Sequence, residues 1–560
     1  MKIGAAAFPA VLWYNSWGMV ETDEGPRIVP ASMTSRYGTL RPAGTPAERK
    51  TFYLTAAIDY PMGRPHLGNA FEKIGADVQA RYRRMQGYDT RFLLGSDEHT
   101  VLIPRYAAAA NTPTDAFVQQ RADIMRDVWS ALQVLPDLFI QTSDPRHELG
   151  CRQFVQRLFE SGFLYDKSHE TLYCENCEEF KRVRDLRGGF CESHPTVRAI
   201  LVRETNYFFR LGSFREPLLA LYRSHPELVR PASVQADIVA SITAGLDDIA
   251  VTRLYSGWGI RAPFDPGQMI YVWVDALLSY LTAAGYGHDD AAFRRWWPAD
   301  LQIIGRDIAG FHGILWPALL LAAGLQPPRH IEVHGLMLHH GEKMSKTMGN
   351  VVDALELADR FGADALRFFL MRACPFREDG DYTHEHFADV YRREIAGQLG
   401  GLYDATVAMC RQSADSPMSV PASQNAVLDW SILPLLVREL HTRFDRCEYH
   451  LALASIVERV VAPAASHAGS AKRSRAGGGD RSGSQPAELI QALRVIAILL
   501  KPFIPHTAER IYATFGFRAA FDDLRLEDAI APDYSASDSW SAVMRLGGQT
   551  PLFPARPPAG

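Results

Sequence analysis

Short apolar runs alternate with longer amphipathic stretches through the first two thirds of the chain. Residues 50–58 are mostly apolar and predict a buried strand, and residues 91–94 predict a second. Between them, a turn rich in proline and glycine at 60–65 precedes a helical pattern from His66 to about Gln86. Strand, helix and strand in this order form the unit of a parallel α/β sheet.

The same rhythm returns after an interruption at 165–205, where three cysteines cluster. It predicts strands at 268–274, 301–304 and 330–334, with a helix around 311–323. From about residue 386 the pattern is helical. Residues 463–487 are rich in Gly, Ser and Ala and carry a short basic run, so we interpret them as a linker, followed by a helix at 488–500.

Composition narrows the class of protein. A chain of 560 residues predicts two to four domains, and a mean hydropathy of -0.12 is typical of a soluble globular protein. The net charge of -5 excludes a simple polycation built for nucleic acid. No apolar run reaches the ~18 residues that span a bilayer, so no membrane partner is expected. The seven cysteines do not suggest a disulfide framework, which favours a reducing cytoplasm.

The first motif with chemical meaning is His66-Leu67-Gly68-Asn69, at a turn from strand to helix. A helix N-terminus presents free N–H groups and the positive end of the helix dipole, which suit triphosphate oxygens. Gly68 removes a side chain where a nucleotide must approach the backbone. His66 can donate a hydrogen bond to charge that develops on the α-phosphate.

The second motif is Lys343-Met344-Ser345-Lys346-Thr347, in a loop between Gly341 and Gly349. Two lysines on a loop with glycine hinges can neutralise a pyrophosphate leaving group in the transition state. Each motif alone is weak evidence, since turns and solvated loops often have such residues. Together, in this order and in an α/β context, they indicate a nucleotide-dependent transfer enzyme.

With these motifs the chain resembles the class I aminoacyl-tRNA synthetases, and within them the methionyl-tRNA synthetase family. Further matches are Gly95–His99, Asn206–Leu211, Tyr271–Ala276, Gly305–Asp307, Phe311–His312 and Trp316–Pro317. The resemblance implies an α/β fold, in which a Rossmann-like nucleotide-binding domain with an inserted zinc knuckle precedes an α-helical bundle. It divides the chain into an extension, expected to be disordered (1–48), two catalytic halves (49–164 and 206–335), the knuckle (165–205), a lysine-loop and stem-contact region (336–385) and the helical domain (386–556).

The resemblance also implies roles for particular residues. The expected catalytic groups are His66, Asn69, Lys343 and Lys346. ATP, usually with Mg²⁺, is expected to contact these residues and also Gly63, Gly68 and Ser345. Asp97 is expected to hold the substrate ammonium, and the methionine pocket is expected to comprise Ile58, Tyr60, Trp273, Ala276, Leu277, Tyr280 and His312. Aromatic walls suit a thioether, although each aromatic residue alone is as consistent with an ordinary core.

The clustered cysteines read Cys174-x2-Cys177-x13-Cys191-x2-His194. This spacing would close a tetrahedral structural Zn²⁺ site, because four protein ligands leave no open position for a substrate. Within the resemblance, the site corresponds to the knuckle inserted between the two halves of the nucleotide fold.

The chain departs from the family in its helical domain. The family's usual Asn and Arg on the first helix are Gly401 and Ala405 here, and neither can read a base edge. A later segment that usually supplies a stacking Trp corresponds to 463–487, which has no aromatic residue. Two departures lie near the first motif: Asn69 replaces the family's usual His, and Asp59 replaces an aromatic or proline. Asp59 is expected to face solvent, or else to recognise a polar or cationic substrate side chain.

These departures lead to three functional hypotheses. In the first, the enzyme activates methionine or a similar amino acid as an adenylate. The enzyme then transfers the activated amino acid to a small molecule or carrier rather than to tRNA. One example of such an acceptor is an N-hydroxylated amine in specialised metabolism, with a separate zinc cupin as partner. In the second, the chain is a divergent methionine–tRNA ligase. In the third, it is a non-catalytic scaffold, which the retained His66, Lys343 and Lys346 disfavour.

Overall fold

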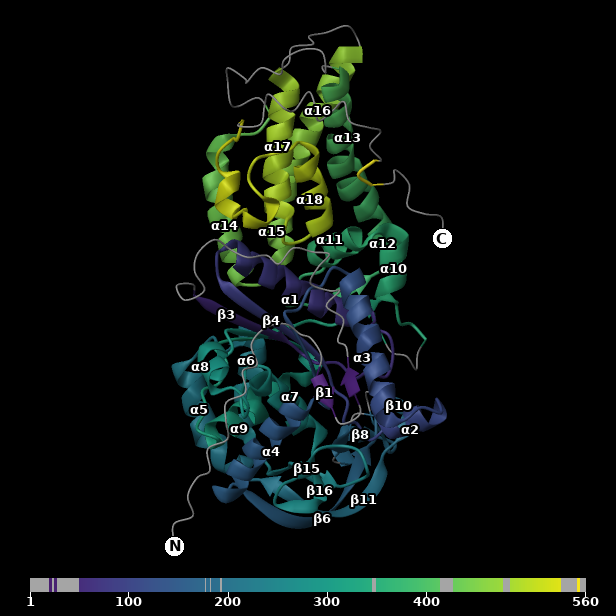
Figure 1. Ribbon diagram of the computed structural model, residues 1–560, viewed down its shortest axis with the longest axis vertical. Coiled ribbons are helices and arrows are strands. Elements are labelled where there is room, and N and C mark those ends of the chain that lie inside the picture. Colours follow the sequence, from purple (N-terminus) through teal and green to yellow (C-terminus); the bar gives the residue numbers. More distant parts are fainter. Residues whose placement is uncertain are drawn as a thin grey trace.

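Helices gather at one end of the molecule, a parallel sheet lies in the middle, and antiparallel ribbons form the other end (Figure 1). The computed structural model describes residues 20–22, 25–27, 50–176, 178–181, 183–191, 194–344, 349–412, 427–476, 484–534 and 551–553. Among these residues no helix is long and apolar enough to cross a membrane.

The central sheet has six strands in the order β12-β18-β17-β3-β4-β5, and every neighbouring pair is parallel. The chain builds outward from β3 to β5, then returns to place β17 on the opposite side of β3. Ligands of such sheets bind at the carboxyl ends of the strands where the strand order reverses. Strand bounds are β3 (Thr51–Ala56), β4 (Asp89–Ser96), β5 (Leu138–Gln141), β12 (Val229–Arg230), β17 (Leu301–Gly305) and β18 (Ile331–His334).

Both faces of the sheet are buried. In β3, Phe52 and Leu54 join the apolar core shared with α1 and the helical domain, whereas Tyr53 joins the core on the opposite face. This alternation follows from the two-residue period of a strand. Helix α1 (Leu67–Met85) lies between the sheet and the helical domain, and α4 (Pro145–Glu160), α7 (Val272–Thr282) and α9 (Trp316–Ala322) contribute to the opposite core.

An insertion separates the two halves of this α/β domain. Its main feature is a long antiparallel pair, β6 (Leu164–Cys174) and β11 (Ile200–Phe209), with β7 (Glu179–Lys181) and β13 (Ile249–Ala250) at its edges. A small sheet follows β7, namely β8 (Leu186–Arg187), β9 (Phe190–Cys191) and β10 (His194–Arg198). A third sheet comprises β14 (Thr252–Leu254), β15 (Arg261–Ala262) and β16 (Asp265–Ile270).

Other elements surround these layers. The flanking helices are α2 (Ile103–Ala109), α3 (Thr114–Ala131), α5 (Arg215–Ser224), α6 (Ala232–Ala244) and α8 (Asp290–Trp296). A small sheet of β19 (Met337–His339), β20 (Glu342–Lys343) and β21 (Gly380–Tyr382) leads into the helical end of the molecule. There lie α10 (Ala354–Phe361), α11 (Ala363–Ala373), α12 (His384–Val390), α13 (Gly401–Gln412), α14 (Leu433–Asp445), α15 (Tyr449–Ile456), α16 (Ala462–Ala476), α17 (Ser484–Leu500) and α18 (Pro505–Thr514).

Two predictions about elements are wrong in part. The strand expected at 268–274 ends at Ile270, and α7 begins at Val272, because a short apolar run does not distinguish a buried strand from a buried helix. Most of the linker expected at 463–487 is helical, since α16 extends to Ala476 and α17 begins at Ser484. Ala464, Ala468 and Ala471 are buried at helical spacing, so one face of α16 packs against the apolar core.

The extension expected at 1–48 lies mostly outside the described residues. Its described part is a short antiparallel pair, β1 (Val20–Thr22) and β2 (Gly25–Arg27), and the expectation of disorder stays a prediction.

Candidate active site

The first motif forms the N-terminus of α1, directly after β3 and the turn that holds Gly63. His66 is the N-cap: its Nδ1 accepts hydrogen bonds from the backbone N–H of Gly68 at 3.0 Å and of Asn69 at 3.4 Å. In turn, Oδ1 of Asn69 accepts a hydrogen bond from the backbone N–H of His66 at 3.1 Å. This reciprocal cap satisfies donors that a helix start would leave unpaired, and it fixes the imidazole over the turn.

Gly68 has a steric reason to lack a side chain. A Cβ at this position would lie 2.8 Å from Cε1 of His66, closer than such atoms normally approach. The glycine therefore lets the capping imidazole fold back over the helix start.

The Asp59 side chain is mostly buried and already pairs with a cation of the protein. Both expectations about it, exposure to solvent and recognition of a cationic substrate, are therefore corrected. Its carboxylate accepts a hydrogen bond from Nδ2 of Asn69 at 2.8 Å and pairs with the ammonium of Lys73 at 2.9 Å. Lys73 also donates to Oε1 of Glu72 at 2.8 Å, and Oε2 of Glu72 lies 2.8 Å from Nε2 of His334 at the end of β18. The pattern of apolar residues gave no sign of this network, because its members are polar residues that come from α1, from the segment after β3 and from the end of β18.

The second motif is only partly described. Lys343 lies exposed in β20, whereas Ser345, Lys346 and Thr347 are outside the described residues. The segment that follows this loop nevertheless meets the first motif directly. The N–H of Leu67 donates to the carbonyl of Val352 at 3.0 Å, and His66 pairs with Asp353 as an isolated bridge. The fold thus joins the root of the lysine loop to the turn that begins α1.

Asp97 follows the carboxyl end of β4, the strand beside β3. Its side chain is buried, and its Oδ1 has no hydrogen-bond partner among the described residues. Burial raises the pKa of Asp97 well above its ordinary range, and the nearby carboxylates of Asp275 and Glu178 raise it further. A buried carboxylate without a counter-charge is costly, so this position suits a cationic ligand group.

The residues expected to form the methionine pocket come from the segment after β3, from α7 and from the π-helical segment Phe311–Leu315. Two of them, Tyr60 and Tyr280, lie close enough to Asp97 to interact with its charge. Ile58, Tyr60, Trp273 and Ala276 are partly exposed, whereas Leu277, Tyr280 and His312 are buried. The indole of Trp273 stacks on Phe311 with the ring centroids 4.0 Å apart.

His312 is held as a neutral imidazole. Its Nδ1 lies 3.1 Å from the carbonyl oxygen of Ile308, which can only accept, so Nδ1 carries the proton. Nε2 therefore accepts from the hydroxyl of Tyr280 at 2.9 Å. Burial lowers the pKa of His312 to about 4, which agrees with this arrangement. A pocket base without charge suits an apolar or thioether substrate side chain.

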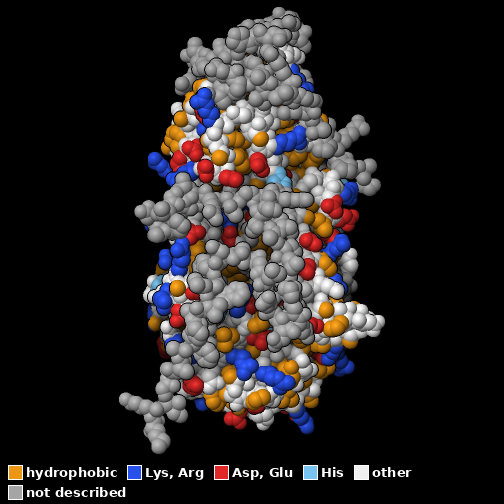
Figure 2. Space-filling model, viewed as in Figure 1, with side chains coloured by type: hydrophobic (Ala, Val, Ile, Leu, Met, Phe, Trp, Pro, Cys, Tyr) orange, Lys and Arg blue, Asp and Glu red, His pale blue; other side chains and the backbone are white. Residues whose placement is uncertain are grey.

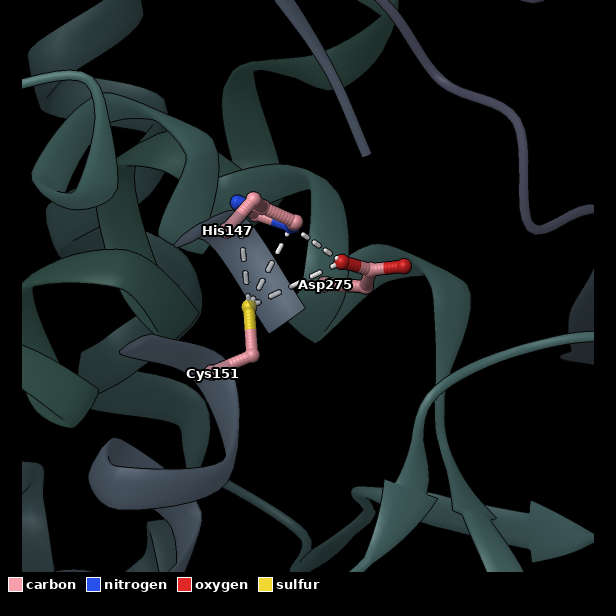
Figure 3. A group of neighbouring side chains, drawn as sticks. All are labelled: His147, Cys151 and Asp275. Carbon is pink, nitrogen blue, oxygen red and sulfur yellow. Dashed lines mark hydrogen bonds and ion pairs between the residues drawn. The ribbon is translucent and has the colours of Figure 1, made fainter. Parts of the chain in front are cut away.

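Three neighbouring polar side chains lie between α4 and α7 (Figure 3). His147 and Cys151, both on α4, point toward Asp275 on α7. Nε2 of His147 lies 2.5 Å from one oxygen of Asp275, and Nδ1 of His99 lies 2.7 Å from the other. Burial and Asp275 raise the pKa of the Cys151 thiol well above its ordinary range, whereas a metal ligand must lose this proton. In the structure these side chains hydrogen-bond to one another and so join α4 to α7.

The expected zinc ligands are also only partly described. Cys174 ends β6 and Cys191 ends β9, and both are buried. Cys177 and the side chain of His194 lie outside the described residues. The four-ligand set stays a prediction, and the burial of the two described thiols is compatible with it.

Comparisons with known proteins agree on one family. The family model described as tRNA synthetases class I (M) matches residues 52–196 and 181–407. The methionine–tRNA ligase of Caldanaerobacter subterraneus is 36% identical over 84% of this chain and 74% of that protein, and the one of Listeria monocytogenes is 35% identical over 91% and 78%. The crystal structure of Mycobacterium tuberculosis methionyl-tRNA synthetase bound by methionyl-adenylate has a TM-score of 0.80 and 32% identity, over 90% of this chain and 100% of that one.

Proposed function

The chain belongs to the class I tRNA synthetases of the methionine type, and we propose that it activates methionine with ATP and transfers it to tRNA. Members of this type are ATP-dependent ligases, so the hypothesis of a non-catalytic scaffold is not supported. The observation that carries the proposal is the buried Oδ1 of Asp97. It lacks a partner among the described residues, follows the carboxyl end of β4 beside β3, and lies near the aromatic side chains of Tyr60 and Tyr280.

ATP is proposed to bind over the start of α1. The positive end of the α1 dipole favours the triphosphate, and His66 is positioned by its cap to donate to the α-phosphate. Lys343, together with Ser345 and Lys346 of the loop, would close on the leaving pyrophosphate. Mg²⁺ would supply further charge neutralisation to the phosphates when bound. Gly63 and Asn69 complete the proposed set.

Methionine is proposed to place its ammonium on Asp97 and its side chain against Trp273, Tyr280 and His312. The substrate carboxylate then attacks the α-phosphate, so that a mixed anhydride forms and pyrophosphate leaves. The residues act by position and electrostatics rather than by acid–base chemistry. Since Lys73 already compensates Asp59, nothing in the described pocket calls for a cationic substrate side chain.

The acceptor is proposed to be tRNA, which revises the prediction of a small molecule or carrier. Alignment with a methionine–tRNA ligase over 91% of the chain includes the helical domain, where the predicted losses lie. The comparisons give no support to a role in specialised metabolism or to a cupin partner. One observation still favours another acceptor: on α13, Gly401 and Ala405 offer no group that reads a base.

Lys and Arg side chains are interspersed with Asp and Glu over the described surface of the face in Figure 2.

A structural Zn²⁺ is proposed for Cys174, Cys177, Cys191 and His194. When bound, it would cross-link the hairpin ends of the insertion. Metal content of the purified protein, measured by atomic emission, tests this proposal: about one zinc per chain is expected, and loss of zinc in a Cys174→Ser/Cys191→Ser variant would assign it.

The decisive experiment measures methionine charging of total tRNA by the full-length protein, with ATP–pyrophosphate exchange alongside. Exchange together with charging is the expected result. Exchange without charging would overturn the tRNA acceptor and restore a small-molecule or carrier acceptor. Absence of exchange with methionine, but exchange with another amino acid, would overturn the substrate assignment.

A further inference from the structure

The two departures near the first motif, Asp59 and Asn69, contact each other. Asn69 and Lys73 lie one turn apart on α1 and both reach the Asp59 carboxylate beyond the end of β3, with Nδ2 of Asn69 at 2.8 Å and Nζ of Lys73 at 2.9 Å. Departures that look independent in the sequence are therefore parts of one buried arrangement.

The bonding partners leave Asn69 only one orientation. The carboxylate of Asp59 can only accept a hydrogen bond, and the N–H of His66 can only donate one. The amide of Asn69 must therefore turn Nδ2 to Asp59 and Oδ1 to His66, as observed. An amide nitrogen carries two hydrogens, and the bond to Asp59 uses one of them. The other is left to donate toward a ligand at the helix start.

Lys73 is what keeps Asp59 in place as an acceptor. Its side chain is 2% exposed, so it does not reach a substrate, and its ammonium lies between the carboxylates of Asp59 and Glu72. Without this cation, the Asp59 carboxylate would be buried beside another carboxylate. If it turned to solvent, the acceptor for Nδ2 would be lost. If it took up a proton, the neutral acid could donate as well as accept and would no longer fix the orientation of the amide.

We propose that Lys73 and Asp59 are a positioning pair for the ATP-binding turn, which acts through Asn69. The pair orients the amide that stands where the family usually has its second histidine, and the amide in turn caps the turn and donates to the triphosphate. The ion pair behind the turn thus fixes the orientation of the amide. This inference rests on the proposed function for its nucleotide.

The test compares Lys73→Met in the otherwise unchanged protein and in an Asn69→Ala background. Two quantities are measured on the full chain: the Kd of ATP by calorimetry without amino acid, and kcat and KM in ATP–pyrophosphate exchange. A matched control is Arg372→Met, which removes the cation of a part-buried ion pair with Glu394 in the helical region. It is expected to lower Tm without changing the Kd of ATP.

We expect Lys73→Met to weaken ATP binding about 10-fold and to lower kcat about 10- to 100-fold, the scale on which small misplacements act. KM for methionine should stay within about two-fold, because Asp97 and the pocket are untouched. In the Asn69→Ala background the same substitution should change Kd and kcat by less than about two-fold, since a pair that acts through Asn69 has nothing left to orient.

Equal losses in both backgrounds, or a lower Tm with unchanged ATP binding, would overturn the proposal. If Lys73→Met gives no cooperative melt, the Asp59→Leu/Lys73→Met variant, which removes both charges and the acceptor for Asn69, takes its place with the same expectations. A protein that binds ATP but does not activate methionine would refute the proposed substrate, while the ATP Kd comparison still decides the role of the pair. A protein that binds no ATP refutes both.

Discussion

Single side chains set the chemistry of this site, and Asp97 is the clearest case. Replacement by Asn keeps the shape of the side chain but removes the charge that would face the substrate ammonium. Loss of a charge-assisted hydrogen bond costs about 1.5–3 kcal/mol, so KM for methionine is expected to rise about 10- to 100-fold. Exchange kinetics with varied methionine measure this change.

The Asp97→Asn variant should bind ATP normally and melt at the same temperature as the unchanged protein or higher, because a buried carboxylate without a counter-charge disappears. A KM for methionine that does not change would contradict the assignment of Asp97.

The second prediction at this scale concerns pH and His312. Its pKa of about 4 in the folded protein lies below the ordinary value of 6.5, so the unfolded chain takes up a proton in this window and the folded protein does not. The stability that comes from the neutral imidazole is therefore complete above pH ~6.5 and is lost as pH falls toward ~4, by at most about 3 kcal/mol.

Thermal melting between pH 7 and pH 4 checks this expectation, with His312→Gln as the comparison. Glutamine keeps polar atoms in the pocket but does not titrate, so its Tm should fall less steeply over this range. Parallel curves for the two proteins would show that other groups govern acid stability.

At the scale of elements, the start of α1 is the part of the site that best tests the fold. Gly68→Ala adds a Cβ that would lie 2.8 Å from the His66 ring, while alanine is intrinsically a better helix former than glycine. We expect kcat of ATP–pyrophosphate exchange to fall at least about 10-fold because the imidazole is displaced, with little change in Tm.

Gly401→Ala on α13 is the matched control, because a Cβ at that position meets open space. It should raise Tm slightly, by the equivalent of at most about 1 kcal/mol, and leave exchange unchanged. If both alanine variants behave alike, crowding of His66 is not the reason for Gly68.

Helices and strands could be predicted from the sequence where the local signals agreed. The helix expected from His66 to about Gln86 is α1, capped by His66, because a turn and a long amphipathic pattern agree. The break at Tyr271 was not predictable, since the apolar run continues from β16 into the buried α7. The ion pair of Asp59 and Lys73 was not predictable either, because it forms only when the segment after β3 packs against α1.

For the site as a whole, the sequence placed His66 and Asp97 where the structure has them, at the ends of neighbouring strands and helices. It did not indicate that residues after the lysine loop bond directly to the turn at Leu67. Such long-range contacts follow from the return of the chain to the middle of the sheet, which local patterns do not contain.

At the scale of the whole molecule, Arg367 joins the catalytic and helical parts. This arginine of α11 is fully buried, and it pairs with Asp77 on α1 at 2.7 Å. It also donates to the carbonyl oxygens of Leu132 and Gln133 next to the sheet and of Pro502 and Phe503 at the end of α17. A single guanidinium thus holds three segments together, with five donors that suit such a junction.

Replacement of Arg367 by Met is therefore expected to act on coupling between the two parts. Breaking a buried pair leaves Asp77 with Arg81 alone, and costs about 3–5 kcal/mol. The turn at His66 and the Asp97 side chain keep their own contacts, so ATP–pyrophosphate exchange below the melting transition should fall less than about three-fold. Charging of tRNA needs the catalytic and helical parts to be correctly placed relative to each other, and it should fall at least about 10-fold. Equal losses in the two assays would mean that Arg367 supports the catalytic domain alone.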